Sequence, residues 1–170
     1  MNATSQPALP ILERLDACHE ARRWVGKRDV VTGWVECERG DWMLWYAAKV
    51  APRSVVVLAA CECARLTLKY VPDGEDRPRV AIEAAEAWAR GGEGAPSLDE
   101  VRASAAGGGA AAYAACDAAY AADAAYAADA ASAAAYAAYA AGGARKDTLK
   151  QCTDIVRKHF PEVPMPEGER

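Results

Sequence analysis

The chain has 170 residues, enough for one domain with a buried core, and its formal net charge is -4 at pH 7. This mild acidity argues against nucleic acid as the main ligand, because nucleic-acid-binding domains usually carry an excess of basic residues. Hydrophobic residues make up 52% of the chain, yet the mean hydropathy is only -0.16, because alanine supplies much of the hydrophobic count. The core must therefore come from leucine, valine, isoleucine and the five tryptophans.

The first residues and the cysteines point to the cytoplasm. The opening stretch, MNATSQPALP, lacks the charged and apolar regions of a secretory signal peptide, and we expect residues 1–10 to form a flexible arm. The six cysteines include no CxxC pair and no cysteine–histidine cluster, which are the spacings typical of metal sites. We therefore expect a cytoplasmic protein with reduced cysteines and without a metal or cofactor.

Apolar residues at helical spacing predict a single all-helical domain over residues 11–161. A first helix is expected from Ile11 to Val25, and Gly26 follows it as a stop signal. In the next stretch, Thr32 is expected to cap a short helix that runs through Glu38.

Gly40 and Asp41 mark the boundary between two predicted helices. Gly40 is expected to end the first, and Asp41 to cap the second, which runs from Trp42 to about Val50. Trp42 and Trp45 share one face of this second helix because they are three residues apart. We interpret that face as part of the core, since paired aromatic residues usually point inward.

Two longer amphipathic helices are predicted in the middle of the chain. One runs from Ser54 to about Tyr70, where apolar residues recur at alternating steps of three and four. The other extends from about Asp76 to Arg90, with Glu83 and Glu86 on its solvated face. The sequence SLDE at 97–100 is a capping box and predicts another helix start.

Alanine dominates residues 103–141, and this Ala-rich segment is predicted to be a long helix, or two, around which the shorter helices pack. Aspartate and tyrosine alternate every three residues from Asp117 to Asp129, so they wind around a helix of 3.6 residues per turn. Such aspartates cannot form a metal cage or an acid pair from one helix alone. The tyrosines either fill gaps between helices or form a recognition surface, and a solvated spacer is a third interpretation.

The last helix is predicted from about Arg145 to Phe160, with an apolar stripe that includes Leu149, Cys152 and Val156. Prolines follow it, and we expect residues 162–170 to form a flexible tail. No membrane-spanning segment is predicted, because aspartate recurs through the Ala-rich segment.

Known catalytic motifs are missing from the sequence. The chain has no GxxxxGK[ST] phosphate loop, no GxSxG elbow and no HExxH zinc motif. Its two histidines, His19 and His159, belong to no recognisable triad or zinc motif. We therefore predict a protein that is not an enzyme, while carboxylates converging from separate helices leave a small enzyme as an alternative.

Three stretches resemble one bacterial family. The segment WVECERGDWMLW at 34–45 resembles the A-C-x-x-G-D-W-x-L-W segment of immunity proteins from polymorphic-toxin systems, the group numbered five. Parts of residues 63–89 and the ending CTDIVR at 152–157 resemble the same family, in which an Ala-rich middle is also typical. The resemblance covers roughly residues 11–161, and Val35 stands where the family usually has alanine.

The resemblance implies a non-enzymatic antidote that neutralises a cognate toxin by direct protein–protein binding, and it identifies no active-site residues. We assign the partner-binding surface to the acidic segment beside two tryptophans and to tyrosines of the Ala-rich segment. These residues are Glu36, Glu38, Asp41, Tyr113, Tyr120 and Tyr126. A structural protein that self-associates into a homo-oligomer through the Ala-rich segment is the other alternative.

Overall fold

The computed structural model describes residues 6–92, 94–97, 99–100 and 145–168. Within these residues the protein is an all-α helical bundle, as predicted, and contains no β-strand. Its helices are α1 (Ala8–Arg14), α2 (His19–Val25), α3 (Val30–Glu36), α4 (Gly40–Val50), α5 (Arg53–Arg65), the 3-10 helix η2 (Leu68–Tyr70), α6 (Arg77–Arg90) and α10 (Arg145–His159). The Ala-rich segment, with Tyr113, Tyr120 and Tyr126, lies outside the described residues.

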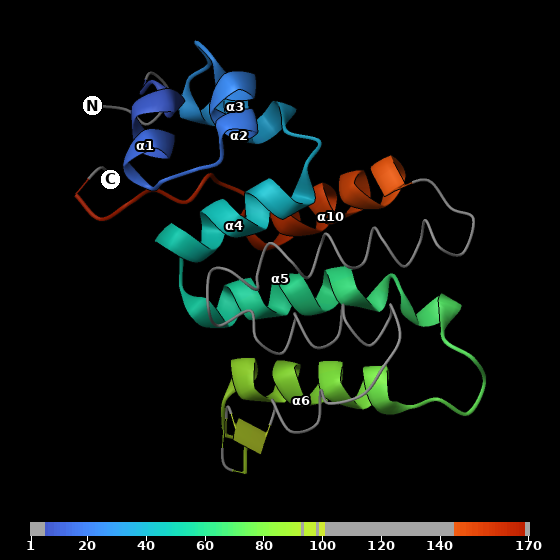
Figure 1. Ribbon diagram of the computed structural model, residues 1–170. Coiled ribbons are helices and arrows are strands. Elements are labelled where there is room, and N and C mark those ends of the chain that lie inside the picture. The colour runs from blue at the N-terminus through green and yellow to red at the C-terminus, as the bar shows by residue number, and fades with distance from the viewer. Residues whose placement is uncertain (1–5, 93, 98, 101–144, 169–170) are drawn as a thin grey trace.

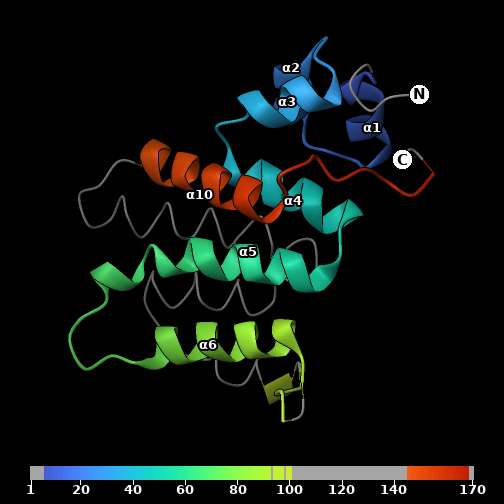
Figure 2. The same ribbon diagram turned by 180° about the vertical axis from the view of Figure 1, so that it is seen from behind.

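The longer helices α10, α4, α5 and α6 lie side by side, and the short helices α1, α2 and α3 gather on the α4 side of this row (Figure 1). Seen from behind, α6 forms the edge opposite the short helices (Figure 2). Helix α5 packs on α6, α10 and α4, so it is the centre of the described bundle.

Small residues cover the faces of α5 that meet its neighbours. Its fully buried positions include Ala59, Ala60, Cys61, Cys63 and Ala64. Short side chains allow the neighbouring helices to approach closely, and this explains why a helix of modest hydrophobicity lies at the centre. The helix predicted from Ser54 to Tyr70 is α5, but it ends at Arg65 and continues as η2. The Thr67 hydroxyl donates to the Ala64 carbonyl oxygen at 2.7 Å, which favours a turn over continued α-helix.

The helix predicted over 11–25 is in fact two helices. Asp16 adopts a φ of 60°, a left-handed conformation that aspartate tolerates better than most residues, and the chain turns there between α1 and α2. Gly26 ends α2 with a φ of 52°, as predicted. The Ala8 N–H donates to the Arg28 carbonyl oxygen at 3.1 Å, so the described part of the predicted arm is held against the bundle.

Helix α3 begins differently from the prediction, because Asp29 rather than Thr32 is its cap. One Asp29 carboxylate oxygen accepts from the Thr32 backbone N–H at 2.8 Å, and the other accepts from the Thr32 hydroxyl at 2.7 Å. The backbone hydrogen bond lowers the pKa of Asp29, with a further contribution from the hydroxyl. A carboxylate serves well here because it satisfies a free N–H at the positive end of the helix dipole.

The other end of α3 is fixed by Arg157, which lies on α10. The Arg157 guanidinium donates to three backbone carbonyl oxygens at the end of α3, which have no partner within the helix. These oxygens belong to Trp34 (3.1 Å), Val35 (2.9 Å) and Cys37 (2.6 Å). Helix α3 therefore ends at Glu36, two residues before the predicted Glu38.

Gly40 begins α4 instead of ending the preceding helix, because α10 passes very close to it. A Cβ atom on Gly40 would lie 2.4 Å from the Cys152 Cβ and 2.9 Å from the Leu149 carbonyl oxygen. Arg39 is the N-cap of α4 and Asp41 lies buried in the first turn of the helix, so its predicted capping role is wrong.

Glu86 on α6 is buried, contrary to the prediction that it faces water. Its carboxylate accepts from Arg65 Nε at 2.7 Å and from Arg65 Nη2 at 3.0 Å, and Arg90 adds a contact at 3.1 Å. The Arg65 hydrogen bonds, which outweigh desolvation, lower the pKa of Glu86. The paired charges stabilise the carboxylate between α5 and α6, while Glu83 is exposed as expected.

The predicted capping box at 97–100 forms, whereas the predicted flexible tail packs against the bundle over its described part. The capping box is confirmed, because Ser97 N–H donates to the Glu100 carboxylate at 2.7 Å and Glu100 N–H donates to the Ser97 hydroxyl at 3.3 Å. The segment predicted as a flexible tail packs against the bundle over its described part, where the Tyr46 hydroxyl donates to the Pro164 carbonyl oxygen at 2.9 Å and Met165 is buried. In the part of the chain that the structure describes, every helix is too short or too polar to cross a membrane.

Candidate functional site

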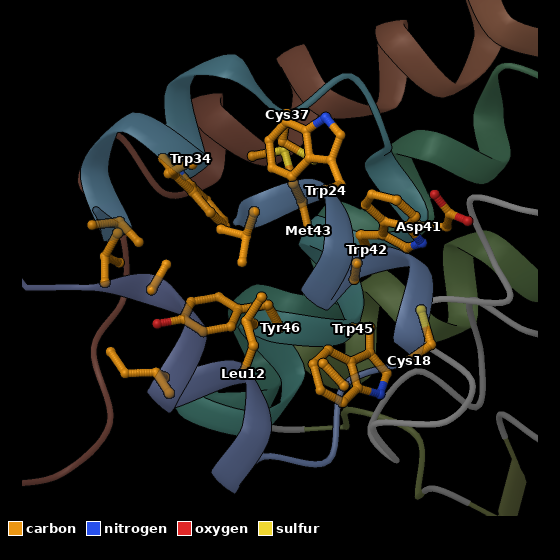
Figure 3. Close-up of a pocket in the computed structure, with 18 residues that line it drawn as sticks. Leu12, Cys18, Trp24, Trp34, Cys37, Asp41, Trp42, Met43, Trp45 and Tyr46 are labelled. Atoms are coloured by element: carbon orange, nitrogen blue, oxygen red, sulfur yellow. The ribbon is translucent and has the colours of Figure 1, made fainter. Parts of the chain in front are cut away.

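A pocket of about 270 Å³ lies among α1, α2, α3 and α4, and we call it the tryptophan pocket. Four of the five tryptophans of the chain line it, which are Trp24, Trp34, Trp42 and Trp45. Figure 3 shows their rings around the pocket together with the ring of Tyr46. The fifth tryptophan lies apart from the pocket on α6.

Small residues keep the tryptophan pocket open. Alanine or glycine stands at four lining positions, which are Ala8, Ala17, Ala21 and Gly33. The aromatic rings are rigid and do not fill the space that these short side chains leave. Trp34 is buried against Tyr46, with 6.0 Å between their ring centroids, and forms a fixed wall. Trp24, Trp42 and Trp45 are only partly buried.

The rim of the pocket consists of two tryptophans, each covered by an arginine. The rings of Trp24 and Trp42 are 6.1 Å apart and tilted by 60°. The Arg28 guanidinium lies 4.7 Å from the Trp24 ring centroid, and the Arg39 guanidinium lies 4.3 Å from the Trp42 ring centroid. Both distances are those of cation–π contacts, which attract the arginines to the ring faces. We call these four residues the Trp–Arg rim.

Each carboxylate of the predicted acidic segment is paired with a cation of the same chain. Arg28 Nε lies 2.7 Å from the Glu36 carboxylate. Arg39 holds the buried Asp41 carboxylate by two hydrogen bonds, at 2.9 Å and 2.6 Å. Glu38 lies 3.1 Å from Lys150 and 3.5 Å from Lys146.

These ion pairs change the electrostatic character expected of the segment. Hydrogen bonds from Lys150, with its charge and that of Lys146, lower the pKa of Glu38. The Asp41 hydrogen bonds raise the pKa of Arg39. The segment that reads as acidic in the sequence is therefore neutralised in the fold.

A second hollow adjoins the tryptophan pocket and shares Trp24 and Trp42 with it; we call it the charged groove. Its charged lining residues are Arg28, Glu36, Glu38, Arg39, Arg145 and Lys146. These described lining residues carry an excess of two positive charges, whereas the whole chain is acidic. The combined site is thus an apolar pocket beside a groove of positive charge.

The described histidine, cysteine and acidic side chains form no metal-binding cluster, and two buried thiols have raised pKa values. Among them, no group of three or more histidine, cysteine, aspartate or glutamate side chains is arranged to hold a metal ion. His159 Nε2 lies 2.9 Å from the Glu62 carboxylate and joins α10 to α5. Burial raises the pKa of the Cys61 thiol to about 12 and also raises the pKa of Cys37, so neither forms the reactive thiolate near neutral pH.

The structure places the predicted site residues in two classes. Glu36, Glu38 and Asp41 lie together around the Trp–Arg rim, with Asp41 buried and the other two exposed. Tyr113, Tyr120 and Tyr126 lie outside the described residues.

Sequence reasoning missed the basic and aromatic members of the site. These are Arg28, Arg39, Trp24, Arg145 and Lys146. The neighbouring positions of Arg39, Asp41 and Trp42 are a local signal for part of the rim. The approach of Trp24 to Trp42, and of α10 to Glu38, has no local signal, because both depend on tertiary packing.

No family model matches the sequence, no curated protein matches it, and no solved structure matches the fold. The resemblance to immunity proteins therefore stays a prediction.

Proposed function

We propose that the chain is a non-enzymatic binding protein that neutralises a bacterial toxin by direct contact, as its resemblance to immunity proteins implies. The proposal places the contact surface at the Trp–Arg rim and the adjoining charged groove. The observation that carries it is the pair of arginine–tryptophan cation–π contacts, at 4.7 Å and 4.3 Å, on the two tryptophans that the apolar pocket shares with the charged groove.

Tryptophan and arginine favour this interpretation because they are the residues most enriched in the energetic centres of protein interfaces. Their positions are also set before any partner arrives. The Glu36 and Asp41 carboxylates hold the two guanidinium groups in place, so little side-chain entropy is lost on binding. An exposed apolar residue, Val35, precedes Glu36 on α3 and extends the surface.

The test is co-expression of the chain with the toxin encoded by the neighbouring gene. We expect the chain to protect the cells and to co-purify with the toxin as a one-to-one complex. A toxin that kills equally well with and without the chain contradicts the proposal. Light scattering on the free chain separates this function from self-association, which predicts a homo-oligomer.

Two exposed valines provide a matched pair of variants. Val35 is 64% exposed on α3, next in sequence to Glu36, and Val80 is 45% exposed on α6. We expect Val35→Gln to weaken toxin binding about tenfold, because it removes an aliphatic side chain that the complex would bury. We expect Val80→Gln to leave the affinity unchanged. Equal affinities for the two variants would place the contact surface elsewhere.

A further inference from the structure

The tryptophan pocket and the charged groove together specify the chemistry of a partner segment. A cavity of about 150 Å³ is enough for benzene, so a pocket of about 270 Å³ has room for one large aromatic or aliphatic side chain. Among the described residues of its lining, Asp41 is the one carboxylate, and Arg39 neutralises it. The pocket therefore favours an uncharged, apolar side chain.

The charge of the groove determines which residues can flank this apolar side chain in the partner. Glu38 is shared by Lys146 and Lys150, so one carboxylate faces two ammonium groups and a positive charge is left over. Arg145 is exposed beside them, and the Lys146 side chain is 80% exposed. A basic segment would be repelled here, whereas carboxylates of a partner would find exposed cations.

We propose that the groove and pocket receive an acidic segment of the partner protein, whose one large apolar side chain enters the tryptophan pocket. The flanking carboxylates of that segment contact Arg145 and Lys146. This inference rests on the proposed function and adds the chemistry of the partner. The acidic sequence at 36–41 does not call for a basic partner, because the fold neutralises that segment.

The experiment is selection of 12-residue peptides from a random phage-displayed library on the whole chain. We expect enriched peptides to carry several aspartates or glutamates around one aromatic or large aliphatic residue. Binding of a selected synthetic peptide should change tryptophan emission, because four of the five tryptophans line the pocket. It should also weaken as salt rises.

Two exposed arginines supply a matched control. Arg145 begins α10 inside the groove, and Arg53 begins α5 away from it. Reversal to glutamate suits the first turn of a helix in both cases. We expect Arg145→Glu to weaken the selected peptide at least about tenfold at low salt, and Arg53→Glu to change its affinity less than twofold.

A third variant tests the pocket itself. Cys18 is exposed and lines the pocket, so Cys18→Phe adds bulk there without entering the core. We expect it to abolish peptide binding while the circular dichroism spectrum and melting temperature stay those of the parent chain. If Cys18→Phe alters the fold, the comparison of Arg145→Glu with Arg53→Glu alone tests whether the peptide binds at the groove.

Several outcomes would overturn the inference. In the selection, they are enrichment of basic or uncharged peptides, or no enrichment at all. In the binding assays, they are acidic peptides whose affinity does not change with Arg145→Glu, or binding of an oligodeoxythymidylate in place of peptides. The last result would reassign the groove to nucleic acid. If the chain blocks the toxin but selects no acidic peptide, the proposed function stands and this inference falls. If acidic peptides bind as described but the toxin is not blocked, the inference stands and the proposed function falls.

Discussion

At the scale of single residues, Gly40 shows how one missing side chain sets the distance between two helices. Its Cα faces the backbone of α10 at Leu149 and Cys152, and a Cβ atom there would lie 2.4 Å from the Cys152 Cβ. Neither contacted atom is the end of a flexible side chain, so the helices themselves would have to move apart. The approach also brings Lys146 and Lys150 of α10 to Glu38.

We predict that Gly40→Ala lowers the free energy of unfolding by about 3 kcal/mol, because it overpacks a close helix contact. Gly33→Ala is the control, since Gly33 is also helical but a Cβ atom there would lie 3.4 Å from Val25 Cγ2. We expect Gly33→Ala to be neutral or to stabilise by up to about 1 kcal/mol, from the better helix propensity of alanine. Urea titrations of both variants measure the difference, and equal stabilities would contradict the prediction.

At the scale of elements, α10 joins parts of the bundle that the local sequence does not connect. Arg157 satisfies the end of α3, and the neighbouring Lys158 and His159 both reach Glu62 on α5, at 2.7 Å and 2.9 Å. Burial by itself would raise the pKa of Glu62, but the hydrogen bonds and charges of Lys158 and His159 outweigh burial and lower it.

The lowered pKa of Glu62 predicts a pH-dependent contribution of this contact to stability. A carboxyl whose pKa is lower in the folded state stabilises the fold above its ordinary pKa of about 4.3. That stabilisation is lost as the pH falls through the lowered value. We expect Glu62→Gln to be less stable than the parent chain at pH 6 and equally stable near pH 2, as measured by chemical unfolding at each pH. A difference that stays constant over this range would show that the ion pair is not the cause.

At the scale of the whole molecule, the burial of the described cysteines shows which parts of the chain enclose the core. Cys37, Cys61, Cys63 and Cys152 are buried, and they lie after α3, on α5 and on α10. Cys18 is exposed at the tryptophan pocket. Burial disfavours the thiolate, which is the form that reacts with alkylating reagents.

We predict that iodoacetamide modifies Cys18 rapidly in the native protein and leaves the four buried cysteines unmodified. Peptide mapping by mass spectrometry identifies each site separately. In urea, the four buried thiols should become reactive together, because one cooperative core protects them. Modification of Cys63 or Cys152 as fast as Cys18 without denaturant would contradict the packing of α5 against α10.

The limits of the long helices α6 and α10 were predictable, whereas the end of α5 and the limits of the short helices were not. The stripes of α6 and α10 repeat over four turns, so their limits follow from the pattern to within about two residues. Helices α1, α2 and α3 have seven residues each, too few to be stable alone, and their ends depend on contacts with other elements. The positive φ of Asp16 and the Arg157 contact with α3 are such features.

Local pattern alone was sufficient for the all-helical class and for the neighbourhood of Glu36, Glu38 and Asp41, because helical periodicity and clustered charges are properties of adjacent residues. Tertiary packing decided the character of the site. It surrounded one pocket with four tryptophans and paired each carboxylate with a cation. The partners of Glu38 come from α10, at the far end of the chain, and electrostatic potential depends on distance in space rather than on order in the sequence. For this reason the segment at 36–41, which is acidic in sequence, is part of a positively charged groove in the folded protein.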